Sequence, residues 1–401
     1  MVIASGPATA DIVEDFGFER SDLRLGRGSN AGVIDPAEQP RDEADSLRGF
    51  FASTEEGAIP TLRYQAIERL ADLMWEPETA ARATLRIVDD IAPDRILVDH
   101  LAFSARLGLD SAGVAYGDVV LGHPTALPIG EEMYGFPPVW PSVFRPTSGD
   151  LAELRSLCEL VARRFTSEWN RVGARLGGSF RPTSDAFAVH GPLVLHNYPA
   201  ELVDAERREH FSTKGFLGAT LRAEQVEPDI DAWIGDAERF AYVSFGSFLS
   251  VRRDVLLRIV DAARSLGLRL AIATGSTDVA QLGHLPADWL VRTYLPQVRL
   301  LSSAALAITH GGNNSVTEAI GQGVPLVVLP FSSDQFAGAA SAERSGFGVV
   351  LDPNSATVEQ LGRGIAAALA LGNDARLRLE AVAAGQRERP GPERAFDALS
   401  A

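Results

Sequence analysis

Short apolar segments alternate with helix-length amphipathic segments in the second half of the sequence, and this alternation constrains the fold more than any other feature. Strands are predicted at 241–247, 268–276, 304–309 and 324–331, and helices at 253–267, 315–322 and 357–371. Strands that alternate with helices form parallel sheets covered on both faces, so we predict a doubly wound α/β domain. In such folds, ligands bind beyond the carboxyl ends of the strands.

The first half carries the same alternation in a less regular form. Strands are predicted at 2–4, 95–99, 112–122 and 192–197, and helices at 12–16, 62–75, 79–91 and 150–172. The strand at 95–99 is expected to be short and buried. Residues 25–58 are polar and rich in glycine and acid, which predicts a long surface loop. The segment 123–142, dense in proline and aromatic residues, is expected to be irregular.

These patterns predict an α/β protein with two doubly wound domains. The first is expected at 1–220 and the second at 238–385. Charged and irregular sequence fills roughly 203–237, so the linker is placed at 221–237. Residues 386–401 are expected to form a helical tail that returns to the first domain.

Composition and charge argue against several classes of protein. The net charge of -16 leaves no lysine- and arginine-rich surface for nucleic acid. The single cysteine, Cys158, excludes an internal disulfide framework and a cysteine-rich zinc site. Its place in a helical pattern predicts a buried thiol in a reducing compartment. No apolar run approaches the roughly 20 residues of a membrane span, and the first residues do not read as a signal peptide. We therefore expect a cytoplasmic protein.

Polar or glycine-rich residues follow four of the predicted strands in the second half. They are Phe245-Gly246-Ser247, Thr274-Gly275-Ser276, His310-Gly311-Gly312 and Ser333-Asp334-Gln335. Because the carboxyl ends of parallel strands meet at one edge of a sheet, these segments are expected to form a single site.

The segment from His310 to Glu318 runs from a strand end directly into a helix. Its two glycines would let a ligand approach the backbone, and Asn314 and Ser315 begin the helix. Free N–H groups and the helix dipole favour an anion there, and a charged or hydrogen-bonding imidazole at His310 would lie beside it. This pattern predicts a phosphate site. The alternative is that Asn and Ser only cap the helix.

Carboxylates near a predicted phosphate site suggest hydroxyl groups as further ligands. Glu318 lies one turn into the helix and could accept hydrogen bonds from a ribose. Asp334 and Gln335 present an acceptor and an amide at the next strand end, which suits a sugar. The alternatives are a solvated helix acid and an ordinary helix cap.

The segment "HGGNNSVTEAIGQGVPLVVLPFSSDQ" (310–335) resembles the donor-site signature of the UDP-glycosyltransferases. These are the family 1 nucleotide-sugar transferases of the GT-B fold, including a macrolide-type bacterial branch. Upstream, "TYLPQVRLL" (293–301) is similar to the opening of that signature, and "YVSFGS" (242–247) to the first strand and loop of the second domain. The resemblance is specific over about 240–350 and implies two Rossmann-like domains facing a cleft.

The resemblance implies a role for each matching residue. Tyr294 would stack on the uracil, and Gln297 would reach the base or ribose. Glu318 would bind the ribose hydroxyls, which favours UDP over dTDP donors. The diphosphate would lie against Gly246, Ser247, His310, Gly312, Asn314 and Ser315, and the transferred sugar against Asp334 and Gln335. Asn313 and Gly338 depart from the tryptophan and asparagine that many relatives have there.

The catalytic base is the weakest point of the resemblance. The family uses a histidine in the loop after its first strand, oriented by an aspartate that Asp99 matches. "MVIASGP" resembles the second strand of the family, so the first strand-loop-helix unit is expected to be missing. Three explanations account for the absent histidine loop. The start could be misassigned or the chain truncated, another histidine could act as base, or catalysis could be lost. His123 is a candidate, whereas a His100–Asp99 pair is not expected, because adjacent strand residues point to opposite faces.

We therefore expect an inverting transfer of a hexose from a UDP-sugar to a hydroxyl of a small lipophilic acceptor. The acceptor would lie against residues 133–140 and the helices of 62–91. Neither a metal nor another cofactor is expected, since the helix end stabilises the leaving diphosphate. The missing unit would leave apolar surface exposed on the first domain, which predicts poor solubility or self-association. We expect a monomer or weak homodimer.

Two other functions stay open at this stage. The chain could be a non-catalytic relative that binds nucleotide or a partner protein, or a nucleotide-sugar epimerase of the same fold. A nicotinamide dehydrogenase is poorly supported, because no G-x-G-x-x-G follows a predicted strand.

Overall fold

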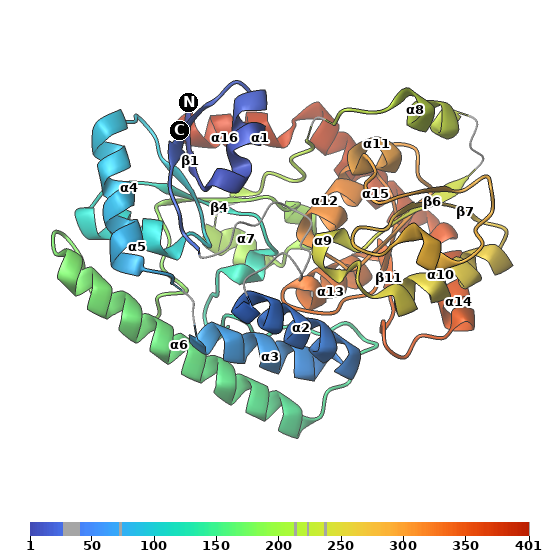
Figure 1. Ribbon diagram of the computed structural model, residues 1–401, viewed down its shortest axis with the longest axis horizontal. Coiled ribbons are helices and arrows are strands. Elements are labelled where there is room, and N and C mark those ends of the chain that lie inside the picture. Colours follow the sequence, from blue (N-terminus) through green and yellow to red (C-terminus); the bar gives the residue numbers. More distant parts are fainter. Residues whose placement is uncertain (27–40, 72–73, 212–214, 223, 236–238, 401) are drawn as a thin grey trace.

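The computed structural model describes residues 1–26, 41–71, 74–211, 215–222, 224–235 and 239–400. Two α/β halves lie side by side, the N-terminal one in blue to green and the C-terminal one in yellow to red (Figure 1). The predicted fold class is therefore confirmed. The last helix, α16 (Gly391–Ser400), lies with the N-terminal half, where the Nε of Arg95 donates a hydrogen bond to the Leu399 carbonyl at 3.4 Å.

The C-terminal half is built on one sheet of six parallel strands in the order β11-β10-β9-β6-β7-β8. The strands are β6 (Phe240–Ser244), β7 (Arg269–Ala273), β8 (Leu290–Arg292), β9 (Leu306–Thr309), β10 (Leu326–Val328) and β11 (Gly348–Val350). The chain runs outward from β6 to β8 and then crosses to β9 on the other side of β6. This reversal is a topological switch point, where loops on the two sides diverge and leave room for a ligand.

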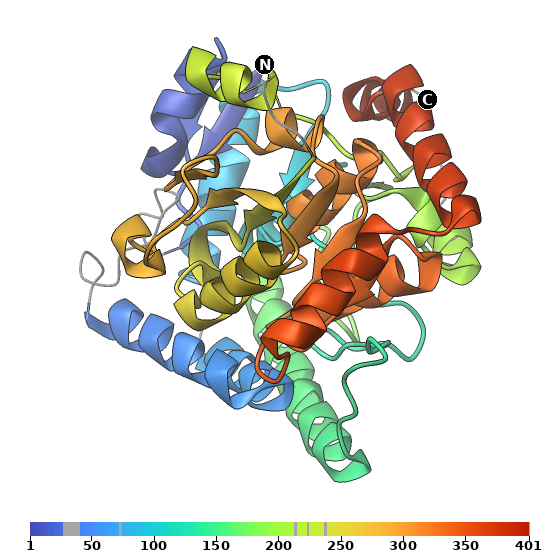
Figure 2. The same ribbon diagram turned by 90° about the vertical axis from the view of Figure 1, so that its right-hand side faces the viewer.

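Helices cover both faces of this sheet, as the side view shows (Figure 2). Alternate residues of a strand point to opposite faces, so Val243 packs under α10 and α14, whereas Tyr242 packs with α12 and α15. The helices of this half are α8 (Pro228–Gly235), α9 (Gly246–Leu249), α10 (Arg253–Ser265), α11 (Gln297–Leu301), α12 (Asn313–Gly321), α13 (Gln335–Ser345), α14 (Val358–Leu369) and α15 (Asn373–Glu388).

The N-terminal half has its described strands in two separate parallel sheets. One pairs β1 (Val2–Ser5) with β2 (Glu19–Asp22), and the other has the order β3 (Leu97–Asp99), β4 (Gly117–Val120), β5 (Leu193–His196). Its helices are α1 (Ala10–Asp15), α2 (Arg41–Glu56), α3 (Ala58–Ala71), α4 (Pro77–Ile91), α5 (Phe103–Ala112), α6 (Ser148–Leu176) and α7 (Ala205–Phe211).

The long helix α6 runs along the outside of the N-terminal half and packs on α3 (Figure 1). Its apolar residues, among them Trp169 and Phe165, form a core with Leu62 of α3. Cys158 is buried in this core, and burial raises the pKa of its thiol to about 11. The segment 123–142 is irregular apart from one short 3-10 turn, Pro124–Ala126, so that prediction is confirmed.

Three predictions about local structure are wrong. Residues 41–56 form helix α2 and not a surface loop, because its apolar residues pack on α3 and the C-terminal half; residues 27–40 lie outside the described ranges. The charged segment 203–237 contains helices α7 and α8. The strand at 95–99 is only partly buried, since Leu97 is 43% exposed.

Several apolar side chains are exposed on the N-terminal half. Ile12, Phe16 and Leu97 are all exposed, and β1 and β3 belong to different sheets within the described residues. The oligomeric state stays a prediction. Across the described ranges, no helix has the length and apolar character needed to cross a membrane.

Candidate active site

A cavity of about 1010 Å³ lies at the switch point of the six-stranded sheet, between the two halves. Most of the residues predicted to bind a donor line it, which brings together four loops that are far apart in the sequence. They are Gly246, Tyr294, Gln297, His310, Gly312, Asn314, Ser315 and Gln335. The side chain of Ser247 lies outside the described part of the structure. The donor assignments themselves stay predictions.

The amino end of α12 forms one wall of the cavity and is not capped by a side chain. Gly312 occupies the N-cap position, and the hydroxyl of Ser315 points instead to the Oε1 of Gln297 at 3.5 Å. The Asn314 amide oxygen accepts from Asn197 of the N-terminal half at 3.4 Å. The alternative that Asn and Ser only cap this helix is therefore wrong, and the helix end is open to an anion.

His310 lies next to this helix end and is neutral at pH 7, because burial lowers its pKa to about 4. Two glycines make room for the ring. A Cβ on Gly312 would lie 2.4 Å from the Nε2 of His310, and a Cβ on Gly246 would lie 3.1 Å from its Cε1. A neutral imidazole can donate one hydrogen bond to a phosphate oxygen but adds no charge.

Tyr294 and Gln297 lie where the chain leaves β8. The Tyr294 side chain is 69% exposed, so its ring is free to stack on a planar ligand. Gln297 donates from Nε2 to Glu318, which is buried and does not line the cavity. Burial raises the pKa of Glu318, while Gln297 and the guanidinium of Arg222 at 3.6 Å oppose that rise. Glu318 would reach a ribose only after Gln297 moves.

Asp334 and Gln335 point in different directions, although both were predicted to face one sugar. Gln335 lines the large cavity, and its Oε1 accepts from the amides of Phe331 and Ser332 at 2.9 and 3.1 Å. Asp334 lines a second cavity of about 180 Å³ and accepts from the His123 amide at 2.7 Å. Burial raises the pKa of the Asp334 carboxyl.

The N-terminal half closes the large cavity with α2 and α3. Gln65 of α3 donates to the Ser333 hydroxyl at 2.7 Å and accepts from the Ser333 amide at 3.1 Å. These bonds hold Ser333 in the left-handed region, at φ 52°, directly before Asp334 and Gln335. Gln65 and Arg222 were missed from the sequence, since neither belongs to a motif and the fold alone brings them here.

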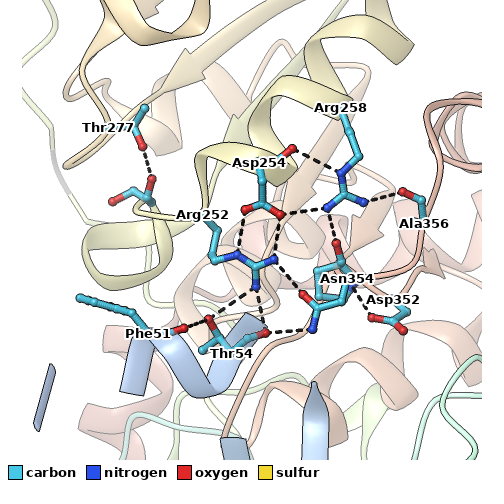
Figure 3. A network of polar contacts seen from close by, with 11 residues as sticks. Phe51, Thr54, Arg252, Asp254, Arg258, Thr277, Asp352, Asn354 and Ala356 are labelled. Carbon is cyan, nitrogen blue, oxygen red and sulfur yellow. Dashed lines mark hydrogen bonds and ion pairs between the residues drawn. The ribbon is translucent and has the colours of Figure 1, made fainter. Parts of the chain in front are cut away.

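The carboxyl-terminal end of α2, at Thr54, is fixed to the C-terminal half by a polar cluster (Figure 3). Buried Arg252 donates to the carbonyl of Thr54 at 2.9 Å and to Asn354 at 2.8 Å, and pairs with Asp254 at 2.9 Å. Asn354 donates to the same Thr54 carbonyl at 2.9 Å. These bonds fix the helix whose side chains Ser46, Leu47 and Phe50 line the cavity.

His123 is not placed to act as a base, which corrects that prediction. Its ring is buried against Tyr198, with Nδ1 at 2.9 Å from Thr125 Oγ1 and Nε2 at 3.3 Å from Ser341 Oγ. Burial lowers its pKa to about 3, and the ring lines neither cavity. Asp99 closes β3 near the small cavity and accepts from the Leu101 amide at 2.9 Å.

The expectation about His100 is also wrong, because the Nδ1 of His100 lies 3.5 Å from the Oδ1 of Asp99. The alternation of a strand applies only up to Asp99, where β3 ends, and His100 lies in the following turn. Within the described ranges, no group of three His, Cys, Asp or Glu side chains could hold a metal ion. The expectation that no metal or cofactor is needed stays a prediction.

The fold is the GT-B fold of two Rossmann-like α/β halves. Over its whole length the chain is similar to the calicheamicin glycosyltransferase CalG4, with a TM-score of 0.65 and 18% identity over 100% of this chain and 89% of that one. It is also similar to the spinosyn rhamnosyltransferase SpnG complexed with thymidine diphosphate. The TM-score is 0.58 and the identity 19%, over 96% of this chain and 88% of that one. At identities of 18% and 19%, the similarity to these structures shows that the fold is shared.

Residues 222–373 match the family model described as "UDP-glucoronosyl and UDP-glucosyl transferase". An uncharacterized UDP-glucosyltransferase of Bacillus subtilis, YojK, is 30% identical over 220 residues, 49% of this chain and 54% of the relative. The oleandomycin glycosyltransferase of Streptomyces antibioticus is 29% identical over 219 residues, which are 54% of this chain and 50% of the relative. The chain thus spans about half the length of these relatives, and the predicted resemblance is confirmed.

Proposed function

We propose that this protein transfers a sugar from a UDP-sugar to a hydroxyl group of a small lipophilic acceptor, with inversion at the anomeric carbon. The observation that carries this proposal is the uncapped amino end of α12 in the wall of a cavity of about 1010 Å³. A diphosphate there would accept hydrogen bonds from free backbone N–H groups, which also stabilise the charge that develops as it leaves.

The nucleoside would extend from this helix end toward Tyr294, whose exposed ring offers a stacking surface. Gln297 would then bind the base or ribose, and Glu318 would accept from the ribose hydroxyls. The structural neighbour in complex with thymidine diphosphate supports a nucleoside diphosphate as ligand. The carboxylate of Glu318 favours a ribose, and therefore UDP, because deoxyribose offers one hydroxyl fewer.

The transferred sugar would lie near Gln335 and Ser333, at the border of the large and the small cavity. The small cavity is lined mainly by apolar groups, including Leu101, Tyr134 and Phe136. Such a lining suits a lipophilic acceptor with few polar groups.

Isothermal titration calorimetry with UDP, dTDP and UMP tests this function. UDP is expected to bind best, and Glu318→Ala to weaken it about tenfold or more, since hydrogen bonds to a charged group contribute roughly 1.5–3 kcal/mol. Glu359→Ala is the matched control, because Glu359 is exposed on α14 and pairs with Arg363 of the same helix. No binding of UDP to the wild type, or equal binding by Glu318→Ala, would contradict the proposal.

A non-catalytic relative that only binds nucleotide is the second candidate. Its distinguishing result is tight UDP binding with neither sugar transfer nor slow hydrolysis of a UDP-sugar. The exposed apolar residues of the N-terminal half are compatible with a partner protein, but they do not favour this function over transfer.

A further inference from the structure

A buried histidine with unused ring nitrogens faces the small cavity of about 180 Å³. His100 is 1% exposed, and neither Nδ1 nor Nε2 makes a hydrogen bond within the described ranges. Leaving a buried polar group unpaired costs free energy, and a ligand in this cavity would supply the missing hydrogen-bond partner. The other polar groups that line this cavity are Arg69, Thr125, Tyr134, Ser333 and Asp334.

The backbone fixes His100 independently of its ring. Its amide donates to the Val119 carbonyl at 3.1 Å, and its carbonyl accepts from Arg106 at 2.6 Å. Arg106 is itself buried and pairs with Asp118 at 2.8 Å. Substitution of the imidazole therefore leaves these bonds in place.

Asp99 orients the ring from one side. The Nδ1 of His100 lies 3.5 Å from the Asp99 carboxylate, which the Leu101 amide also holds. Burial opposes ionisation of Asp99, but the interactions with His100 and the Leu101 amide outweigh it and lower the pKa of the carboxyl. An ionised carboxylate beside Nδ1 favours the tautomer with the proton on Nδ1, which leaves the lone pair of Nε2 free.

The small cavity adjoins the donor cavity. Arg69 and Ser333 line both, and Ser333 directly precedes the two residues predicted to bind the sugar. A hydroxyl group in the small cavity would therefore lie between His100 and the anomeric carbon of a donor. His196 makes a useful contrast: its ring nitrogens are also unpaired, but the ring stacks on Phe216 and lines neither cavity.

We propose that His100 is the general base of this protein and that Asp99 is its positioning residue. The inference rests on the proposed function. The acceptor oxygen forms a bond to the anomeric carbon while its proton moves to Nε2 of His100. The bond between the anomeric carbon and the diphosphate oxygen breaks, and its electron pair leaves with UDP. The positive charge that forms on His100 is stabilised by Asp99.

The test uses the full chain with UDP-glucose and two probe acceptors, benzyl alcohol and 4-nitrophenol. His100→Ala is expected to lower kcat for benzyl alcohol by about 10²–10⁴-fold, the range for loss of a general base. The loss should be much smaller for 4-nitrophenol, which is largely ionised near pH 8 and needs no base. Added imidazole should restore part of the rate, because the ring removed from His100 leaves space for it. Affinity for UDP should stay unchanged.

His100→Gln is the second variant, since it keeps the size of the side chain but cannot take the proton, and His284→Ala is an exposed histidine control. Equal losses for both acceptors without imidazole rescue would show a structural role and overturn the assignment. Sugar transfer at the wild-type rate by both variants would also overturn the assignment of His100. So would a wild-type protein that binds UDP but neither transfers the sugar nor hydrolyses UDP-glucose. No UDP binding at all would instead overturn the proposed function.

Discussion

Two buried basic side chains near the interface between the halves have opposite surroundings. Arg252 contacts Thr54, Asn354 and Asp254 through all of its guanidinium nitrogens (Figure 3). His100 has an equally buried side chain, but its ring makes no hydrogen bond within the described ranges and faces a cavity. A fully paired buried group holds structure together, whereas a ring with a free nitrogen beside a cavity is available for chemistry.

The largest effect on stability is expected from Arg252→Met. Arg252→Met removes hydrogen bonds from a charged donor to the Thr54 carbonyl and to Asn354, and such bonds contribute roughly 1.5–3 kcal/mol each. The Asp254 carboxylate that remains is 54% exposed, and Met keeps the apolar stem. Urea unfolding followed by circular dichroism measures the loss of free energy of unfolding. Arg363→Met on α14 is the matched control, because Arg363 is exposed and forms an ion pair with Glu359 of the same helix. A loss below about 1 kcal/mol would show that the cluster in Figure 3 does not hold α2 in place.

The buried histidines that lack an acidic partner should make the protein sensitive to acid. Burial lowers the pKa of His123 and His196 to about 3 and that of His310 to about 4, against an ordinary value of 6.5. The unfolded chain therefore binds more protons below pH 6.5, so this stability is present above that pH and is lost as the pH falls. Each histidine contributes up to about 1.4 kcal/mol per pH unit.

Urea unfolding at pH 7 and pH 5.5 checks this prediction. We expect the free energy of unfolding to fall by about 2–3 kcal/mol over this interval. The raised pKa values of Glu318 and Asp334 act in the opposite direction, because the native protein takes up protons on these carboxyls before the unfolded chain does. The expected loss is therefore smaller than the sum for the three histidines. His196→Gln should flatten the profile, while His284→Gln at the surface should leave it unchanged. An unchanged stability between the two pH values would contradict the burial of these rings as neutral groups.

The smallest effect is expected from Gln65→Ala, at roughly 1 kcal/mol, since two neutral hydrogen bonds to Ser333 are lost. Because these bonds position the segment before Asp334 and Gln335, the KM for the UDP-sugar should rise while the affinity for UDP stays the same. Steady-state kinetics together with calorimetry separate the two quantities. A parallel change in both would show that Gln65 acts on the whole cavity and not on the sugar end.

The two halves also differ in how far the sequence predicts them. In the C-terminal half, strands, helices and polar strand ends are encoded locally, so the fold and eight of the lining residues could be found from patterns and resemblance. Helix α2 could not be predicted from the sequence, because its apolar residues are few and it is stabilised by packing on α3 and on the C-terminal half. The proposed base, His100, could not be predicted either, since the position of its ring depends on where β3 ends. The domain boundaries and the cytoplasmic location stay predictions.

The most direct test of the donor site is a crystal structure of the protein with UDP. The diphosphate is expected at the amino end of α12, with oxygens about 2.7–3.2 Å from the backbone nitrogens of residues 313–315. The uracil should stack on Tyr294. A diphosphate bound elsewhere, or a helix end filled by protein side chains while UDP is bound at another site, would contradict the donor site and the function that depends on it.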